Sequence, residues 1–458
     1  MKKQISLFTA TFLPLFLFLN WPGRLSFDPL QQLGYARAAS YSDNHPIVMA
    51  LLWKPLDEIW PGQAGMLVLF GGAWSLGLIL LNRRQPRPWI LLAAMVPPVF
   101  FNMGTIWKDV GLVSFFVLSV ALIEDGRRKH LALVLAPLFL TFSFRHNAVF
   151  AFLPLCLWWG WVILRGFSSP IRALGAALGG ACLILGFLFL GSTIHKTIKA
   201  QEANLWVQVP AYDLVGTSVM ADVSLVPEEF KGTFPDLTVP TLKRYYTDKA
   251  IDDMMYRIDP KVVFGLPGPE DARARLARAW LVAISAEPVA YLRHRWNVFS
   301  NHLGMKTTVY YPFHSGIDPN SMGISTNLPS QHKTLLLINS KLRDTPIYRI
   351  WVYALLSILS AIYVLRSLGY AALPAWLVVS FSSGWLYLAG NFFVIPAADL
   401  RYSLLSLQLF SFVIFFAIDH AWARRTTIGN QVPGTGVAKE GAMEGQSGTI
   451  RRIKELGV

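Results

Sequence analysis

Residues 173–191 read ALGAALGGACLILGFLFLG and contain no charged side chain. A helix needs about 20 consecutive, mostly apolar residues to cross a bilayer, and its backbone polar groups must be satisfied within the helix. Comparable windows recur along the chain at 5–21, 63–82, 88–105, 110–124, 131–145, 147–165, 347–366, 371–394 and 402–421. The sequence therefore predicts an all-α polytopic membrane protein with about ten transmembrane helices.

The composition favours the same class of protein. Of the residues, 53% are hydrophobic and 15% are charged, and the mean hydropathy is +0.42, whereas about a quarter of the residues of a soluble domain are charged. The formal net charge of +14 is not accompanied by an RNA- or DNA-binding motif. We therefore expect a lipid bilayer as a partner and no nucleic acid. Cys156 and Cys182 both lie in apolar windows, so no disulfide is expected.

The distribution of cations sets the expected orientation. Many Lys and Arg residues concentrate in loops on one side of the predicted helices, which the positive-inside rule assigns to the cytoplasm. These cations are Arg83, Arg84, Arg87, Arg127, Arg128, Lys129, Arg165, Arg172, Arg366, Arg424 and Arg425. We expect a protein of the bacterial inner membrane with both termini in the cytoplasm. The first window follows Lys2 and Lys3 like a signal peptide, but we interpret it as an uncleaved helix.

The predicted helices divide the chain into four parts. They are an N-terminal transmembrane module with the first catalytic loop (1–191), a periplasmic soluble insert (192–346), a C-terminal transmembrane module (347–421) and a disordered, basic cytoplasmic tail (422–458). The insert is expected to be mainly α or α+β. Its stretch Glu270–Leu303 has helical apolar periodicity, and Arg293 and Arg295 favour a position along the membrane surface.

Four basic side chains fall at the outer ends of predicted helices: Lys108, Arg145, His146 and Arg401. Ionisable residues at membrane depth are costly and indicate function by default. The alternative is a set of interfacial anchors whose charged heads reach the lipid headgroups. Because they share one face with several carboxylates, we favour a site. Converging Arg and Lys suit a phosphate or pyrophosphate group.

The first outer loop carries three candidate site residues: Asp28, Asp43 and His45. Asp28 precedes Pro29, which predicts a helix start capped by the carboxylate, and such a cap does not exclude chemistry. Asp43 and His45 are separated by one residue, a spacing that suits a cation or a phosphate. Two ligands are weak evidence for a metal, and an Asx-type turn before Pro46 is the alternative.

The other two outer loops repeat the combination of a cation with a carboxylate. Lys108 and Asp109 are adjacent on a predicted helix and therefore do not face each other, so a mutual ion pair is not expected. In the last outer turn, Asp399 precedes Arg401 and Tyr402 and is expected to cap the final helix.

These motifs resemble the GT-C superfamily of membrane glycosyltransferases, specifically bacterial members related to protein mannosyltransferases and lipid A aminoarabinose transferases. The resemblance rests on Asp28, the Tyr41–Pro46 segment with the helix that follows it, Trp107–Asp109 and Asp399–Tyr402. It covers roughly residues 1–165 and 345–421. The first loop departs from the family pattern, because Asn44 precedes the basic residue and a non-proline residue follows Pro46. This departure puts metal dependence in doubt.

The resemblance implies an inverting glycosyltransferase. It would move a sugar from a polyprenyl-phosphate carrier to an envelope glycan, lipid or protein at the periplasmic face. Asp28 would be the catalytic base, and Asp43 would orient the substrate or bind a cation. The expected substrate-binding residues are His45, Lys108, Asp109, Arg145, His146, Asp399, Arg401 and Tyr402. No cofactor is assigned, and a divalent cation stays open.

Two other classes of function remain open at this point. A transporter or flippase of a lipid-linked sugar or polysaccharide precursor also needs a cationic cleft. Transporters usually place their binding groups near the bilayer midplane on repeated, broken helices, and this chain has no internal repeat. A membrane assembly factor without catalysis is the third alternative. In that case the outer polar residues would be individually replaceable.

Overall fold

The chain is almost entirely helical in a computed structural model that describes residues 2–84, 89–203, 205–228, 236–258, 270–306 and 309–429. The helices of the N-terminal part are α1 (Lys2–Asn20), α2 (Phe27–Ala38), α3 (Ile47–Ile59), α4 (Ala64–Arg84), α5 (Trp89–Ala94), α6 (Pro97–Asn102), α7 (Lys108–Asp125), α8 (Arg128–Leu133), α9 (Leu135–Phe144), η1 (His146–Ala148), α10 (Val149–Ile163) and α11 (Ser169–Thr197). The middle part contains η2 (Leu205–Val207), α12 (Gln208–Ala221), α13 (Val239–Tyr245), α14 (Ile251–Ile258), α15 (Glu270–Ala286), α16 (Pro288–His302) and α17 (Ser330–Leu342). The C-terminal part contains η4 (Pro346–Tyr348), α18 (Ile350–Leu368), η5 (Tyr370–Ala372), α19 (Ala375–Val394), η6 (Leu400–Ser403) and α20 (Leu404–Gly429).

Five helical segments of the described chain are long and apolar enough to cross a membrane. They are Ala64–Arg83, Ser169–Thr197, Ile350–Leu368, Ala375–Val394 and Leu400–Arg425. The window predicted at 88–105 is instead broken into α5 and α6, because Pro97 starts a new helix. The window at 131–145 is divided between α8 and α9. These five candidate spans support the prediction of a membrane protein, whereas the predicted number of about ten transmembrane helices is not confirmed.

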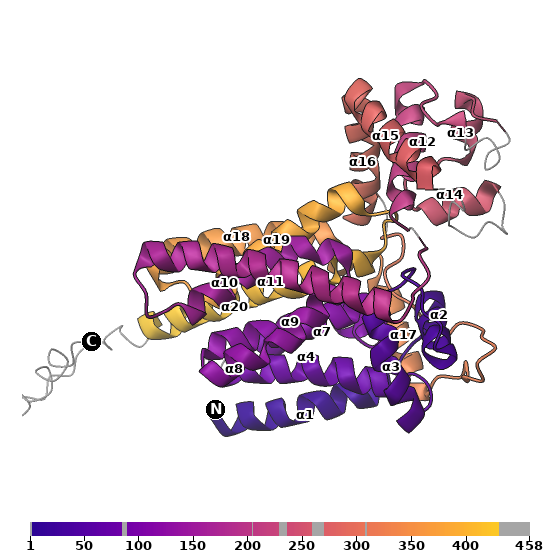
Figure 1. Ribbon diagram of the computed structural model, residues 1–458. Helices are drawn as coiled ribbons and strands as arrows, with labels where there is room; N and C mark the ends of the chain where they lie inside the picture. Colours follow the sequence, from indigo (N-terminus) through magenta and orange to yellow (C-terminus); the bar gives the residue numbers. More distant parts are fainter. Residues whose placement is uncertain are drawn as a thin grey trace, which may run out of the picture. The chain divides into compact units, whose positions relative to one another are not determined.

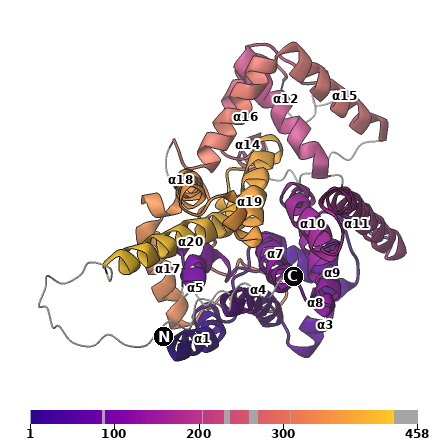
Figure 2. The same ribbon diagram turned by 90° about the vertical axis from the view of Figure 1, so that its left-hand side faces the viewer.

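The apolar helices lie roughly side by side, with α2 and α3 near one end and α8 near the other (Figure 1). Close approach depends on small residues. A Cβ atom added at Gly77 on α4 would lie 2.8 Å from the backbone nitrogen of Leu118 on α7. On α10, a Cβ atom at Gly160 would lie 2.9 Å from Cα of Ala176 on α11. Figure 2 shows α10 and α11 next to each other from a second direction. Such small-residue contacts are typical of helix packing in membranes.

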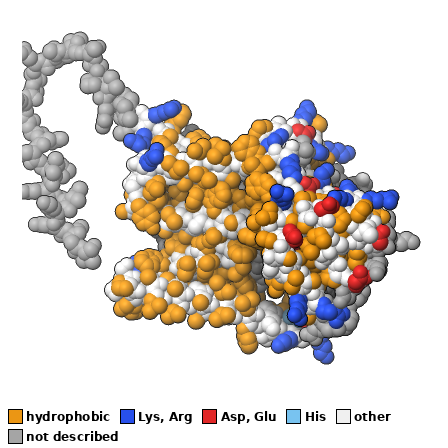
Figure 3. Space-filling view, turned by 90° about the horizontal axis from the view of Figure 1, so that it is seen from above, with side chains coloured by type: hydrophobic (Ala, Val, Ile, Leu, Met, Phe, Trp, Pro, Cys, Tyr) orange, Lys and Arg blue, Asp and Glu red, His pale blue; other side chains and the backbone are white. Residues whose placement is uncertain are grey.

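The outer surface of the bundle is apolar. The candidate span in α11 has only 17% of its apolar window buried, and its exposed side chains include Leu174, Leu185 and Phe189. Figure 3 shows hydrophobic side chains covering most of one part of the molecule, while Lys, Arg, Asp and Glu are mixed over another part. A soluble protein rarely exposes an apolar area of this kind, so a lipid bilayer is the environment that fits it.

The insert predicted at 192–346 divides into two parts. Helices α12–α16 enclose a second hydrophobic core that includes Tyr212, Leu242 and Met254. From Val309 onward the chain instead packs on the main core, and α17 contacts α1 and α6. No strand is formed within the described residues, where the only sheet-like contacts are isolated bridges. The mainly α alternative for the insert is therefore the one observed.

The stretch Glu270–Leu303 forms two helices, α15 and α16, with Pro288 at the start of the second. Arg295 does not support the expected position of this stretch along the membrane surface. Its guanidinium is fully buried and pairs with the buried carboxylate of Asp213 at 2.6 Å. Arg293 is exposed.

The last helix extends further than expected. α20 continues to Gly429, so residues 422–429 of the predicted tail are helical, and residues 430–458 lie outside the described part. Within the described part, residues 418–429 of α20 belong to a second unit.

Candidate active site at the end of the helical bundle

Asp28 is held in place by three loops. The main-chain nitrogen of Leu25 donates to the carbonyl oxygen of Gly316 at 3.1 Å, and the Trp107 indole donates to Ser26 Oγ at 2.8 Å. α2 begins at Phe27 after Ser26, so the prediction that Asp28 caps this helix is wrong. Asp28 lies in the first turn with its carboxylate free for other contacts.

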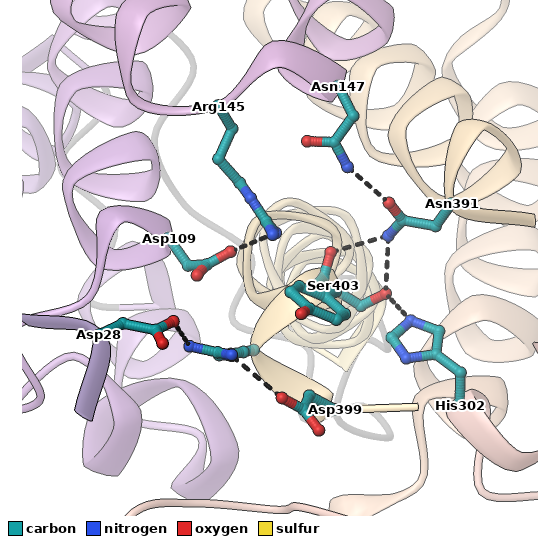
Figure 4. A network of polar contacts seen from close by, with 10 residues as sticks. Asp28, Asp109, Arg145, Asn147, His302, Asn391, Asp399 and Ser403 are labelled. Atoms are coloured by element: carbon teal, nitrogen blue, oxygen red, sulfur yellow. Dashed lines mark hydrogen bonds and ion pairs between the residues drawn. The ribbon is translucent and has the colours of Figure 1, made fainter. Parts of the chain in front are cut away.

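That carboxylate, which is labelled in Figure 4, binds Arg401, a residue from the far end of the sequence. Arg401 Nη1 donates to Asp28 Oδ2 at 2.8 Å, and Arg401 Nε donates to Asp399 Oδ2 at 3.1 Å. The guanidinium also lies over the rings of Trp107 and Tyr402, at 5.4 and 5.3 Å from their centroids. One arginine is therefore shared by two carboxylates. Asp399 does not cap η6 through its side chain, because this carboxylate accepts from Arg401 instead.

The two carboxylates have opposite pKa shifts. Burial acts against the charged form of Asp28, but the positive charges of Arg401 and Lys108 outweigh it and hold the pKa below its usual range. Asp399 is more deeply buried, and that burial raises its pKa to about 6 despite Arg401. At neutral pH Asp28 is firmly ionised, whereas Asp399 is close to its titration range.

A second ion pair joins Asp109 and Arg145. Arg145 Nη1 donates to Asp109 Oδ1 at 2.6 Å, and the guanidinium lies 4.4 Å from the centroid of the Tyr402 ring. Lys108 does not pair with its neighbour Asp109, as expected from helix geometry. Lys108 forms no ion pair within the described residues, which leaves its ammonium group available to a ligand.

Polar residues behind Tyr402 form a network that the sequence did not indicate. Asn147 Nδ2 donates to Asn391 Oδ1 at 3.0 Å, and Asn391 Nδ2 donates to the carbonyl oxygen of Tyr402 at 2.7 Å (Figure 4). His302 Nε2 lies 2.6 Å from Ser403 Oγ. These contacts fix the turn that carries Arg401. No charge or motif marks these small amides and hydroxyls in the sequence.

His45 is a buried neutral side chain and not a cationic phosphate ligand. Burial and the nearby charge of Lys108 lower its pKa to about 3. Its Nε2 atom lies 2.8 Å from Gln31 Oε1, and Gln31 Oε1 also accepts from Asn44 Nδ2 at 3.1 Å. Among the described residues, His45 Nδ1 is buried without a hydrogen-bond partner.

Asp43 joins the loop between α2 and α3 to the segment that follows α11. Its Oδ1 atom accepts from the main-chain nitrogen of Ala203 at 2.5 Å, and its own main-chain nitrogen donates to the Gln201 carbonyl oxygen at 3.0 Å. His195 Nε2 lies 3.9 Å from Asp43 Oδ2. Asp43 therefore has a structural role, because it holds two chain segments together. This role argues against the catalytic role predicted for it.

Several of the residues described above line one cavity of about 640 Å³, namely Asp43, His45, Lys108, Arg145 and Tyr402. Its polar lining includes Lys108 and Arg145, and its apolar lining includes Phe144, Phe150 and Val394. Asp28 and Arg401 do not line the cavity. Asp28 nevertheless lies close enough to Lys108 for their charges to interact. The arrangement therefore places cations in the cavity and the ionised carboxylate on a neighbouring site.

The donor set offers little to a metal ion. Across the described residues, no three His, Cys, Asp or Glu side chains are grouped as ligands. The carboxylates that do converge, Asp28 and Asp399, are both occupied by Arg401.

The structure brings together most of the predicted site residues. Those in direct contact are Asp28, Asp109, Arg145, Asp399, Arg401 and Tyr402, while Asp43, His45 and Lys108 line the cavity. The side chain of His146 lies outside the described part.

Comparison with known proteins leaves the family open. No family model, no curated protein and no solved structure matches this chain.

Proposed function

We propose that the protein is an inverting glycosyltransferase that takes a sugar from a polyprenyl-phosphate carrier and delivers it to an envelope acceptor. One observation carries most of this proposal: a single cavity combines two cations with apolar walls, at one end of helices that suit a membrane. A phosphate group needs the cations, and a polyprenyl chain needs the apolar walls. The resemblance of the outer loops to GT-C glycosyltransferases supports the same conclusion.

Lys108 and Arg145 hold the carrier phosphate in this mechanism. Lys108 supplies a point charge, and Arg145 supplies a planar fork, one nitrogen of which is bound to Asp109. Negative charge grows on the phosphate as the bond to the sugar breaks, so these cations stabilise the transition state. Arg401, which we expected on the phosphate, is assigned instead to the control of Asp28, because two carboxylates bind it and it does not line the cavity.

Asp28 accepts the proton of the acceptor hydroxyl or amine. The acceptor atom attacks the sugar C1 atom, the bond from C1 to the phosphate oxygen breaks, and its electron pair leaves with the polyprenyl phosphate. In this mechanism, the acceptor approaches the face of C1 opposite to the leaving group. Displacement from that face inverts the anomeric centre.

Arg401 regulates the basicity of Asp28. A carboxylate with a depressed pKa is a weak base, so Asp28 needs to be released from Arg401 before it takes a proton. Asp399 already binds the same guanidinium through Nε. A shift of Arg401 toward ionised Asp399 frees Asp28 and raises its pKa toward the ordinary value.

A reconstitution experiment tests the proposed function and its main alternative together. Purified protein in liposomes receives undecaprenyl phosphate that carries a radiolabelled hexose, together with an envelope fraction as acceptor. We expect label to leave the carrier and become covalently attached to the acceptor. Movement of intact carrier across the liposome membrane without transfer would support the transporter class, and no effect on either would contradict both.

A further inference from the structure

The cavity has an aromatic wall that the proposed phosphate site does not use. Trp206 and Trp280 line the same cavity as Lys108 and Arg145. Trp280 lies on α15, and its indole Nε1 donates to Asp213 Oδ2 at 2.8 Å. An indole held at its nitrogen by a carboxylate has a fixed ring plane, so this part of the wall is preorganised.

Asp213 fixes two stretches of the cavity wall at once. Its carboxylate is fully buried on α12 and binds Arg295 at 2.6 Å and His294 at 3.1 Å in addition to Trp280. Arg295 Nη1 in turn donates to the carbonyl oxygen of Ile395 at 3.0 Å, and Ile395 also lines the cavity. Removing the carboxylate would release both Trp280 and the Ile395 segment.

His45 adds a directional polar group to the lining of the same cavity. Because the Gln31 amide oxygen is the acceptor in their contact, His45 Nε2 carries the hydrogen, and Nδ1 is left with a lone pair. That nitrogen is buried, lacks a partner among the described residues and belongs to a side chain that lines the cavity. Buried polar atoms are nearly always satisfied, so a hydroxyl donor on a ligand would meet this need.

An aromatic ring at Trp280 together with a hydrogen-bond acceptor at His45 Nδ1 fits a sugar ring better than a hydrocarbon chain. A pyranose presents a flat face of C–H groups to an aromatic plane and hydroxyl hydrogens at its rim. A polyprenyl chain can contact Trp280, but it has no donor for His45. We propose that Trp280 and His45 Nδ1 form the subsite for the sugar of the lipid-linked donor, with Asp213 as a positioning residue. This inference rests on the proposed function, because it takes the carrier phosphate to lie on Lys108 and Arg145.

Binding of two carriers tests the subsite apart from the phosphate site. The protein in nanodiscs is titrated with undecaprenyl phosphate and with undecaprenyl phosphate that carries glucose, mannose or galactose. In the wild type, we expect at least one sugar to increase affinity over the sugar-free carrier. Trp280→Ala should reduce that increase by about three- to tenfold, as expected for an aromatic contact. Its affinity for the sugar-free carrier should stay unchanged.

Matched variants separate contact from folding. Trp280→Phe keeps an aromatic face and should lose less than Trp280→Ala. Asp213→Asn keeps an acceptor oxygen for the indole and should retain more of the sugar-dependent affinity than Asp213→Ala. Trp296→Ala is the control, because Trp296 is a half-exposed tryptophan on α16 that does not line the cavity.

The outcomes distinguish failure of the subsite from failure of the proposed function. If the wild type binds the sugar-free carrier and no sugar adds affinity, the subsite is wrong and the phosphate site stands. If Trp280→Ala reduced the affinity for the sugar-free and the sugar-bearing carrier equally, the proposed sugar subsite would also be wrong. If the wild type binds neither carrier, the proposed function itself is contradicted.

Discussion

At the scale of single residues, the Asp28–Arg401 contact yields the sharpest prediction. Asp28→Asn keeps the shape of the side chain but cannot take a proton, and loss of a general base typically costs about a hundredfold to ten-thousandfold in rate. We expect normal abundance and almost no sugar transfer, measured with the purified protein. Asp57→Asn is a control for a carboxylate of the same outer loop that binds Arg37 away from the site. Near-normal turnover of Asp28→Asn would remove Asp28 from the mechanism.

The pKa of Asp399 predicts a pH dependence with a definite sign. Burial raises this pKa to about 6, so Asp399 is protonated below pH 6 and ionised above it. Only ionised Asp399 attracts Arg401 away from Asp28, and transfer should therefore increase as the pH rises through about 6. Asp399→Asn should be slower and lose this step in a rate profile from pH 5 to pH 8. A wild-type profile that is flat over this range would contradict the exchange of Arg401 between the two carboxylates.

Lys108 and Arg145 are expected to act on the carrier. Lys108→Gln should increase the KM for the lipid donor by about tenfold or more, because it removes one charge-assisted contact to the phosphate. Arg145→Lys should rescue Arg145→Gln only in part, since Lys lacks the planar fork. Lys243→Gln alters an exposed ion pair with Asp222 and is the control. Unchanged KM values in the Lys108 and Arg145 variants would make them interfacial anchors.

Part of this site could be predicted from the sequence because isolated charges at the ends of apolar windows are conspicuous. This signal identifies Lys108, Arg145 and Arg401. The binding of Arg401 to Asp28 spans 373 positions, and nothing local to either residue indicates it. The sequence does not indicate Asn147 and Asn391, because a neutral amide carries no such signal. The neutral state of His45 could not be predicted either, because burial, which lowers its pKa, is a property of the folded chain.

At the scale of helices, the position of the site depends on how closely α4 and α7 approach each other. A side chain at Gly77 would collide with the backbone of Leu118, which cannot move aside. Gly77→Val should therefore reduce thermal stability and membrane abundance, because overpacking costs about 1–3 kcal/mol or more. Gly72→Ala on the same helix meets nothing within 4 Å and is the control. Equal stability of both variants would show that α4 and α7 are not in close contact.

The sequence predicts well which segments form helices, but it predicts less well where each helix begins and ends. Apolar composition over a full window identifies candidate spans such as α11 and α19, which the structure contains. The windows at 88–105 and 131–145 are divided in the structure, and Pro97 shows why composition alone does not detect a break. The insert could not be divided in advance, because its segment after Val309 packs on residues distant in the sequence.

At the scale of the whole molecule, the cation asymmetry predicts one orientation. The insert should face the periplasm, and the loop at 82–87 and the C-terminal tail should face the cytoplasm. Alkaline phosphatase fused after Glu270 should be active, and a fluorescent protein fused at the C-terminus should fluoresce. The opposite pattern would place the site on the cytoplasmic side and exclude a periplasmic acceptor.

The central claim is that the cavity holds the lipid carrier, and photocrosslinking tests it directly. An undecaprenyl phosphate sugar with a photoreactive group in its first prenyl unit is irradiated with the protein in nanodiscs, and the labelled peptides are identified by mass spectrometry. We expect labels at the apolar lining, on Phe144, Phe150 and Val394. Excess unlabelled carrier and Lys108→Gln should both reduce them. Labels confined to the exposed face of α11, for example at Leu185 and Phe189, and unaffected by competitor would contradict the claim.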